Sequence, residues 1–288
     1  MLPQVAFVMD KDPSLQHTTL TQGAILHRTL ANNPGQEYFL YVPHGTENDA
    51  KIFVTVHGIS RNASEHAQKF APFAEKHKVI MIAPHFPSDR FPDYQRLGRE
   101  GKGERADTAL NEIVAEVTNL TWTRVRQLYL FGYSGGAQFA HRYMLAYPER
   151  VAKVVLGAAG WYTFPDMNLR FPKGLQESRS LPQVRFNPEN FLTIPVCVLV
   201  GEQDNRRDAD LNKSPQIDLF QGRTRLERGR RWINAMEHQA RAHGLITPYA
   251  FHVLPRSPHS FTLSMHRGRM GEETFGFLFA NSADPNIP

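Results

Sequence analysis

The sequence predicts an α/β fold with a mostly parallel central sheet of about eight strands flanked by helices. From about residue 50 onward, short β-branched or aromatic runs alternate with helix-like segments, which implies right-handed crossovers between parallel strands. The apolar runs before that point read as a hairpin. A third observation is the run 128–131, which leads directly into Gly132-Tyr133-Ser134-Gly135-Gly136 and then into a helix-like pattern. A length of 288 residues suits one large domain with insertions, so we expect a single domain over residues 1–288.

The expected elements follow from the spacing of apolar residues. Strands are predicted near 24–30 and at 38–42, 52–56, 79–83, 127–131, 151–156, 196–200 and 250–254. Helices are predicted at 64–77, 106–120, 137–147, 226–243 and 271–279. The segment 163–192 contains four prolines and no sustained period, so we expect it to form a cap or lid inserted between two strands.

The junction at residues 132–136 has the pattern G-x-S-x-G, in which a serine sits on a sharp turn between a strand and a helix. Such a turn strains the backbone at the serine, and the glycines on either side leave room that side chains would fill. We therefore expect Ser134 to be a nucleophile, held out at the edge of the sheet. The alternative is a glycine-rich turn with a passive serine.

A serine is a poor nucleophile at neutral pH and needs a base within hydrogen-bond reach, itself oriented by an acid. In folds with this elbow, the acid and then the base follow the serine along the chain. The strand predicted at 196–200 ends in a G-x-x-D loop, so we expect Asp204 to be the acid. Glu202, Asp208 and Asp210 share this loop and are the alternatives.

The last predicted strand, 250–254, runs into a loop that carries His259. We expect His259 to be the base, because it completes the chain order and the position that Ser134 demands. His252 lies within the strand and His266 lies beyond the loop, so structural roles suit both of them better.

The tetrahedral intermediate of acyl transfer needs two preorganised N–H donors for its oxyanion. The residue after the nucleophile supplies one, and a turn after an earlier strand supplies the other. We expect these donors to be the amides of Gly135 and Ile59, because the strand at 52–56 runs into an H-G-x turn. His57 is then expected to brace the turn without transferring protons. The alternative is an ordinary tight turn.

Side chains on the loops at this edge of the sheet bear on the substrate. Five arginines fall there, and guanidinium groups suit carboxylates, which motivates the hypothesis of an anionic substrate; they are Arg61, Arg90, Arg206, Arg207 and Arg256. Tyr133 and Trp161 are further candidates for substrate contact, and Trp161 could instead anchor the cap. A second group of arginines within residues 223–231 reads mostly as a solvated helix face.

Other function classes find little support. The net charge of +5 comes from Lys and Arg scattered among acids, so nucleic-acid binding is not expected. The 13 histidines form no zinc motif, and neither a dinucleotide nor a Walker motif is present, so we expect no metal and no cofactor. No run is long enough to span a membrane, and residues 1–10 do not resemble a signal peptide. We therefore expect a cytoplasmic protein, or an exported one if a leader has been removed; the sequence allows a homodimer.

Taken together, the elbow, acid loop, histidine loop and H-G-x turn resemble the α/β-hydrolase superfamily over about residues 35 to 280. Within it, the chain is similar to the esterase and polyhydroxybutyrate-depolymerase-like group, through the H-G-x-S-R-N turn at residues 57–62 and the segment Gly-Trp-Tyr-x-x-Pro at residues 160–165. The resemblance implies cleavage of ester polymers or oligomers, and related enzymes act on amide-linked poly(aspartic acid).

These observations predict a cofactor-independent serine hydrolase that cleaves a carboxylic ester, polymeric or anionic, through an acyl-enzyme formed by Ser134, His259 and Asp204. Two alternatives keep the same site: an amide-cleaving depolymerase of the poly(aspartic acid) type, and an acyltransferase that passes the acyl group to an alcohol or amine. A non-catalytic binding protein that kept the fold is the third alternative.

Overall fold

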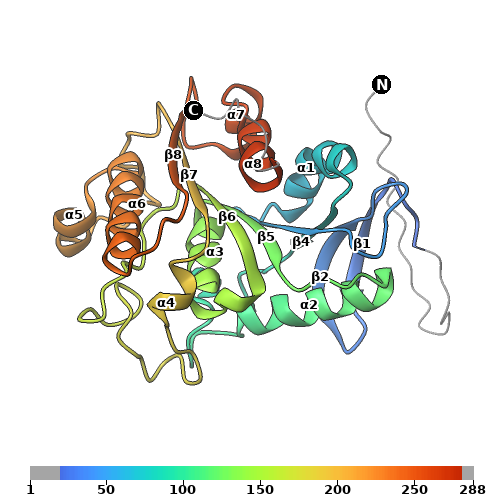
Figure 1. Ribbon diagram of the computed structural model, residues 1–288, viewed down its shortest axis with the longest axis horizontal. Coiled ribbons are helices and arrows are strands. Elements are labelled where there is room, and N and C mark those ends of the chain that lie inside the picture. Colours follow the sequence, from blue (N-terminus) through green and yellow to red (C-terminus); the bar gives the residue numbers. More distant parts are fainter. Residues whose placement is uncertain (1–19, 281–288) are drawn as a thin grey trace.

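The computed structural model describes residues 20–280, which form one continuous eight-stranded sheet with helices on both faces (Figure 1). The N-terminal stretch that the signal-peptide prediction concerns lies outside these residues. The strands are β1 (Ile25–Leu30), β2 (Asn33–Tyr41), β3 (Ile52–Val56), β4 (Ile80–Pro84), β5 (Leu128–Tyr133), β6 (Val151–Gly157), β7 (Val196–Gly201) and β8 (Tyr249–Leu254). The helices are α1 (Ala63–His77), α2 (Ala106–Thr121), α3 (Gly135–Ala146), α4 (Pro188–Phe191), α5 (Pro215–Gln221), α6 (Arg225–Ala242), α7 (Phe261–His266) and α8 (Met270–Phe279).

The strands lie in the order β1-β2-β4-β3-β5-β6-β7-β8. β1 pairs antiparallel with β2, and β2 pairs antiparallel with β4, while every pairing from β4 to β8 is parallel. The expected α/β fold with a mostly parallel sheet is confirmed. Because β3 to β8 run in one direction, their carboxyl ends share one edge of the sheet, where the loops that carry the candidate site begin.

Two hydrophobic cores lie on opposite faces of this sheet. Along β3, the side chains of Ile52 and Val54 belong to the core shared with α2, α3 and α6, while Phe53 points into the core shared with α1 and α8. Figure 1 shows the same division, with α1 and α8 on one side of the sheet and α2 and α3 on the other. All five residues of β3 are buried, which explains why the strand reads as a continuous apolar run.

The structure adds elements that the apolar spacing did not predict. β2 begins at Asn33, and the short helices α4, α5 and α7 occupy segments expected to be loops. Each of the three short helices begins at a capping side chain. Asn187 accepts from the amide of Glu189 at the start of α4, Ser214 accepts from Ile217 at the start of α5, and Ser260 accepts from Leu263 at the start of α7. Such short helices bury too few residues to show a hydrophobic period.

The segment expected to form a cap is largely irregular and is fastened to neighbouring helices. At its start, the amide of Thr163 donates to Nε2 of His141 on α3 over 2.9 Å, and its carbonyl accepts from the indole of Trp232 on α6 over 2.8 Å. Further along, the carbonyl of Ser180 accepts from the amide of Glu100 over 2.7 Å. A lid role for residues 163–192 stays a prediction. Among residues 20–280, no helix combines the length and apolarity that crossing a membrane requires.

The packing of the core between the sheet and helices α1 and α8 can be tested at Phe275 on α8. Its ring is 1% exposed and lies 4.8 Å from the ring of Phe53 and 5.3 Å from that of Phe73, measured between centroids. Phe275→Ala should lower the free energy of unfolding by about 3–5 kcal/mol, because it removes buried contacts and leaves a cavity. The same substitution at Phe220 on α5, which is 55% exposed, should change it by less than about 0.5 kcal/mol. Guanidinium unfolding measures both, and equal effects would contradict this packing.

Candidate active site

The turn between β5 and α3 holds Ser134 in an unusual backbone conformation. Ser134 has φ 53° and ψ −111°, a region that non-glycine residues rarely adopt. A Cβ at Gly132 would lie 2.2 Å from the carbonyl oxygen of Gly136, and a Cβ at Gly136 would lie 2.0 Å from that of Val56. Any residue other than glycine at these two positions would therefore clash with backbone. The tight turn leaves the side chain of Ser134 partly exposed at the carboxyl edge of the sheet.

Three predicted site residues lie in one hydrogen-bonded chain. Nε2 of His259 is 3.1 Å from the hydroxyl oxygen of Ser134, and Nδ1 of His259 is 2.7 Å from Oδ2 of Asp204. The Asp204 side chain is 1% exposed and that of His259 is 19% exposed. An ionised carboxylate only accepts hydrogen bonds, so Asp204 places the ring proton on Nδ1 and leaves Nε2 free to accept from the serine hydroxyl.

The alternative acids have other partners. The carboxylate of Glu202 accepts from the backbone amide of Arg256 over 3.0 Å, and that of Asp208 pairs with Arg225 over 2.6 Å. Asp210 is exposed. Of the four acids on this loop, Asp204 is the one hydrogen-bonded to the candidate base within the described part of the chain.

The alternative histidines also lie apart from the serine. Nδ1 of His252 is 2.8 Å from Glu273 on α8, and Nε2 of His266 is 2.9 Å from the amine of Lys69 on α1. Both rings therefore contact helices on one face of the sheet. The loop after β8 brings His259 alone to the elbow.

The turn after β3 is held by a buried histidine. Nδ1 of His57 lies 2.8 Å from the carbonyl oxygen of Gly58, and Nε2 accepts from the backbone amide of Phe86 over 3.0 Å. Burial lowers the pKa of His57 to about 3, so the ring is neutral near pH 7 and donates from Nδ1. In a trans peptide the C=O and N–H bonds point in opposite directions. By holding the Gly58 carbonyl, His57 therefore also fixes the direction of the Ile59 amide.

Both residues expected to donate to an oxyanion lie beside the nucleophile. A Cβ at Gly58, in the turn that carries Ile59, would lie 3.5 Å from Cβ of Ser134. A Cβ at Gly135 would lie 3.1 Å from Cγ2 of Ile59. The turn after β3 thus packs directly against the elbow, with the side chain of Ile59 against Gly135.

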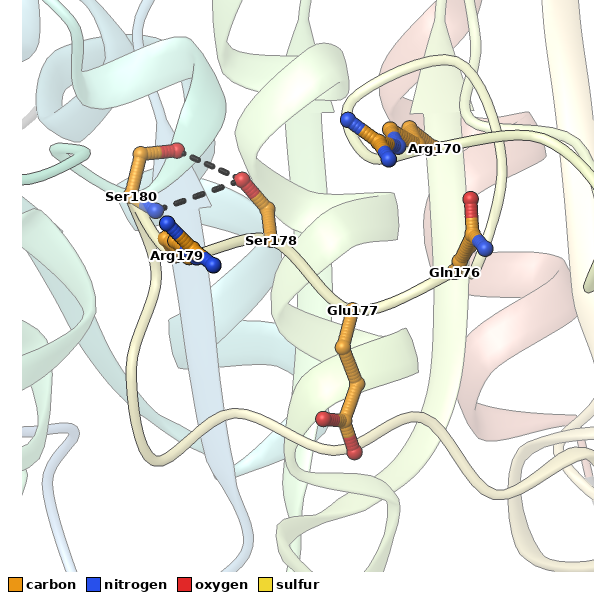
Figure 2. A pocket seen from close by; sticks show the side chains of 6 residues that line it. All are labelled: Arg170, Gln176, Glu177, Ser178, Arg179 and Ser180. Carbon is orange, nitrogen blue, oxygen red and sulfur yellow. Dashed lines mark hydrogen bonds between the residues drawn. The ribbon is translucent and has the colours of Figure 1, made fainter.

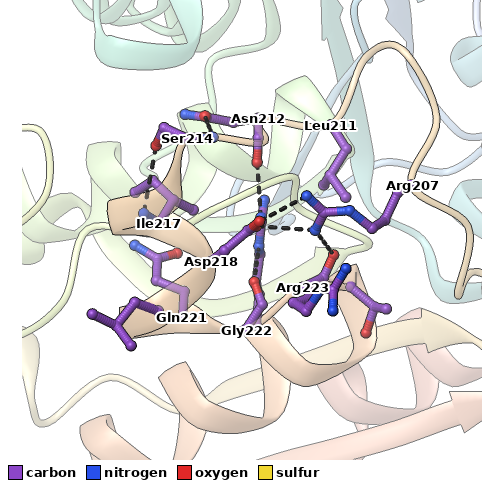
Figure 3. Close-up of polar contacts among 12 residues, drawn as sticks. Arg207, Leu211, Asn212, Ser214, Ile217, Asp218, Gln221, Gly222 and Arg223 are labelled. Carbon is purple, nitrogen blue, oxygen red and sulfur yellow. Dashed lines mark hydrogen bonds and ion pairs between the residues drawn. The ribbon is translucent and has the colours of Figure 1, made fainter.

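Three of the five arginines expected to favour an anionic substrate already pair with other described residues, and they are Arg61, Arg90 and Arg207. The guanidinium of Arg61 donates to the carbonyl of Phe86 over 2.5 Å and lies 4.2 Å above the ring of Tyr94. Arg207 forms a bidentate pair with Asp218 on α5, with its Nη2 2.7 Å from Oδ2, as Figure 3 shows. The guanidinium groups of Arg61 and Arg207 thus already have protein acceptors in this structure, and their contact with substrate stays a prediction.

The two aromatic candidates are also covered by protein. The ring of Tyr133 stacks on that of His259 with centroids 5.4 Å apart, and Tyr133 is 5% exposed. Trp161 is 5% exposed, and the guanidinium of Arg142 lies 4.4 Å from its ring. Both rings are therefore covered by protein and do not form an open face. By contrast, Arg206 and Arg256 are exposed, and their side chains have no hydrogen bond or ion pair to any other described residue.

Two features near the site escaped the sequence analysis. Arg225, expected on a solvated helix face, is buried and bonds to Asp204 with 3.2 Å between Nη1 and Oδ1. The 3₁₀ turn Tyr94–Arg96 borders the elbow, since a Cβ at Gly135 would lie 2.4 Å from the Tyr94 hydroxyl. The pattern T-x-x-E at residues 224–227 is a capping signal that places Arg225 at the first position of α6, next to the acid loop.

A hollow of about 640 Å³ lies away from these residues, within the segment expected to form a cap (Figure 2). Polar side chains line it, and they are Arg170, Gln176, Glu177, Ser178, Arg179 and Ser180. In the described structure, none of the six is hydrogen-bonded to Ser134, His259 or Asp204. We therefore place the candidate active site at the elbow and not at this hollow. Residues 20–280 contain no group of three or more His, Cys, Asp or Glu side chains placed to hold a metal ion.

Solved structures share this architecture. Poly(aspartic acid) hydrolase-1 from Sphingomonas sp. KT-1 superposes with a TM-score of 0.69 at 23% identity, covering 82% of this chain and 92% of that one. LpqC, a poly(3-hydroxybutyrate) depolymerase from Bordetella parapertussis, gives 0.69 at 25% identity, covering 87% and 86%. Acetyl xylan esterase from Aspergillus awamori gives 0.53 at 15%, covering 88% and 99%. No protein-family model and no curated protein matches the chain. The likenesses confirm the α/β-hydrolase fold.

Three histidines that are fully buried predict how stability depends on pH. Burial lowers the pKa of His57, His66 and His141 below the ordinary value, so the folded chain does not bind the protons that the unfolded chain binds below about pH 6.5. Stability should therefore fall as the pH drops below about 6.5, with a limit near 1.4 kcal/mol per pH unit for each histidine.

The variant His141→Gln isolates one of these contributions, since His141 lies on α3 and has no hydrogen bond to the candidate triad. Its unfolding free energy, measured in guanidinium at pH 7 and pH 5, should fall less over this interval than that of the wild-type protein. An equal fall in both proteins would contradict a neutral, buried His141.

Proposed function

We propose that the protein is a serine hydrolase that cleaves a carboxylic ester through an acyl-enzyme, with Ser134 as nucleophile, His259 as general base and Asp204 as the acid that orients it. The observation that supports this most is the chain of two hydrogen bonds, 3.1 Å from Ser134 to His259 and 2.7 Å from His259 to Asp204. The strained backbone at Ser134 and the α/β-hydrolase fold support the same assignment.

In the first half of the reaction, Nε2 of His259 takes the hydroxyl proton as the oxygen of Ser134 attacks the carbonyl carbon. The tetrahedral intermediate collapses, the C–O bond to the leaving alcohol breaks, and the imidazolium of His259 returns the proton to that alcohol. In the second half, His259 removes a proton from water, which attacks the carbonyl carbon of the acyl-enzyme. The C–O bond to Ser134 then breaks, the imidazolium returns the proton to the serine oxygen, and the carboxylic acid is released. The buried carboxylate of Asp204 stabilises the imidazolium in both halves.

The oxyanion of each intermediate needs donors that are in place before the reaction begins. We assign this role to the amides of Gly135 and Ile59, whose residues lie beside Ser134. His57 supports the second donor without touching the substrate, because its ring holds the Gly58 carbonyl and thereby directs the Ile59 amide. A ring whose pKa is lowered to about 3 by burial takes no part in proton transfer near pH 7.

For the substrate, we propose an ester polymer or oligomer. LpqC is a poly(3-hydroxybutyrate) depolymerase, and its structure resembles this chain at 25% identity. A second candidate is an amide-linked polymer, which the likeness to poly(aspartic acid) hydrolase-1 favours. Exposed Arg206 and Arg256, on the loops that carry the acid and the base, would favour substrates with a carboxylate near the scissile bond.

Substituting the nucleophile tests the reaction class. Ser134→Ala should lower kcat for a p-nitrophenyl ester by at least about 10³-fold, because neither an acyl-enzyme nor its proton transfer can form. Hydrolysis is followed by nitrophenolate absorbance, and covalent labelling by a fluorophosphonate should be lost in parallel. The control is Ser60→Ala in the neighbouring turn, where Ser60 donates to Asn62 over 3.0 Å and has no bond to His259. Full activity in Ser134→Ala would exclude the proposed nucleophile.

The two exposed arginines test the preference for anionic substrates. The double variant Arg206→Ala/Arg256→Ala should lower kcat/KM by about 3–10-fold for an ester that carries a carboxylate and leave a neutral ester of equal length unchanged. Raising the ionic strength should shrink the difference, since both charges are exposed. The matched control is Arg90→Ala, because Arg90 already pairs with Glu104 over 2.6 Å. Equal losses on both esters would argue against anionic recognition.

A further inference from the structure

Arg225 lies behind the candidate triad in a buried chain of charges. Its side chain is 1% exposed, with Nη1 3.2 Å from Oδ1 of Asp204 and 2.6 Å from Oδ2 of Asp208. Its Nη2 donates to Oδ1 of Asp208 over 3.0 Å. The two oxygens of Asp204 therefore have different partners, since Oδ1 accepts from Arg225 and Oδ2 accepts from His259. The chain runs Ser134–His259–Asp204–Arg225–Asp208.

The position of Arg225 is fixed by the start of α6. It is the first residue of the helix, directly after Thr224, whose hydroxyl accepts from the amide of Glu227 over 3.2 Å. Desolvating a guanidinium is expensive, and its Nε has no partner within the described residues. A buried ion pair is by itself weak evidence that the pair stabilises the fold. The effect of Arg225 on the orientation of the Asp204 carboxylate is therefore the more informative property.

We propose that Arg225 is a positioning residue that fixes the rotation of the Asp204 carboxylate, and that Asp208, its counter-charge, sets with it the pH range in which His259 acts as a base. This inference rests on the proposed function. Arg225 occupies one oxygen of Asp204 and so presents the other to Nδ1 of His259. Without the guanidinium, the carboxylate is free to rotate and the imidazole loses its fixed orientation.

The charges explain the second half of the proposal. Asp204, Arg225 and Asp208 together carry a net charge of −1, which a proton on His259 neutralises. Removing the charge of Asp208 leaves a net charge of zero, so protonated His259 becomes less favourable. Removing the charge of Arg225 leaves a net charge of −2, so protonation of His259 becomes more favourable. Arg225, and to a lesser extent the charge on His259, hold the pKa of the Asp208 carboxyl below its usual range, so Asp208 and His259 interact electrostatically.

Few other charges face His259. Tyr133 on β5 stacks on its ring, but burial raises the pKa of this phenol, which stays neutral in the working range. Ser134 at the elbow is neutral. Arg256 on the same loop points to solvent, where salt screens its charge. Asp204 and the Arg225–Asp208 pair are therefore the main charges next to the base.

Four variants separate the two effects. Asp208→Asn, which keeps an acceptor for Arg225 on a side chain that is 34% exposed, should move the acid limb of the kcat/KM profile about 0.5–1 unit to lower pH. Arg225→Gln should move it by a similar amount to higher pH and lower kcat about 10–100-fold, with KM nearly unchanged. Arg225→Lys should restore the pH of the acid limb, because the charge is kept. It should recover kcat only in part, because an ammonium lacks the paired N–H donors with which a guanidinium binds two carboxylates in fixed geometry. Asp210→Asn, on the same loop, is the matched control and should leave the limb in place.

The titration of the His259 ring, followed by NMR in the absence of substrate, should shift in the same directions. This measurement needs no turnover, so it tests the charge chain even if Ser134→Ala disproves the proposed reaction. Should Arg225→Gln not fold, Asp208→Asn still decides the question. An unmoved limb and titration in Asp208→Asn, an equal shift in Asp210→Asn, or wild-type kcat in Arg225→Lys would overturn the proposal.

Discussion

The site depends on the close approach of the first turn of α3 to the carboxyl end of β3. The backbone at Gly136 lies so near the Val56 carbonyl that a side chain cannot fit, and the same crowding recurs between Gly132 and Gly136. Where the chain passes from β5 into α3 at this distance, Ser134 adopts a positive φ. Because β3 and β5 are adjacent, with Val56 opposite Gly132, the turn after β3 lies beside the serine. One steric constraint thus creates both the exposed hydroxyl and its neighbouring amides.

A second close approach aligns Asp204 and His259, the candidate acid and base. β7 and β8 pair in parallel with Gly201 opposite Leu254, and a Cβ at Gly201 would lie 2.1 Å from the carbonyl oxygen of Ser257. The loops after these strands therefore run against each other. Polar contacts extend from the histidine loop to the turn after β3: Glu65 on α1 accepts from both Asn62 and Thr262. Helix α1 therefore contacts both the turn after β3 and α7, which directly follows the loop that carries His259.

The sequence predicts those parts of the site that local backbone rules determine. The glycines around Ser134, the apolar run before Asp204 and the turn at His57 each leave a local signature, and the structure brings these segments together. Arginines leave no such signature, because a long cationic side chain has the same local pattern in solvent and in a buried pair. Arg225 and Arg228 both occur in a run expected to be solvated, yet both are buried, while Arg230 on the same helix is exposed. Their partners come from other loops, which the spacing along the chain does not reveal.

The separation of the triad along the chain also affects biosynthesis. His259 follows Ser134 by 125 residues, and it belongs to the last strand–loop unit to join the sheet. At ordinary elongation rates, a ribosome needs about 6–25 s to extend the chain from the serine to the histidine. During that time the emerging polypeptide carries the elbow sequence without His259, so under the proposed mechanism it lacks the base that would activate Ser134. Under that proposal, hydrolysis can begin only after the loop that follows β8 has been synthesised.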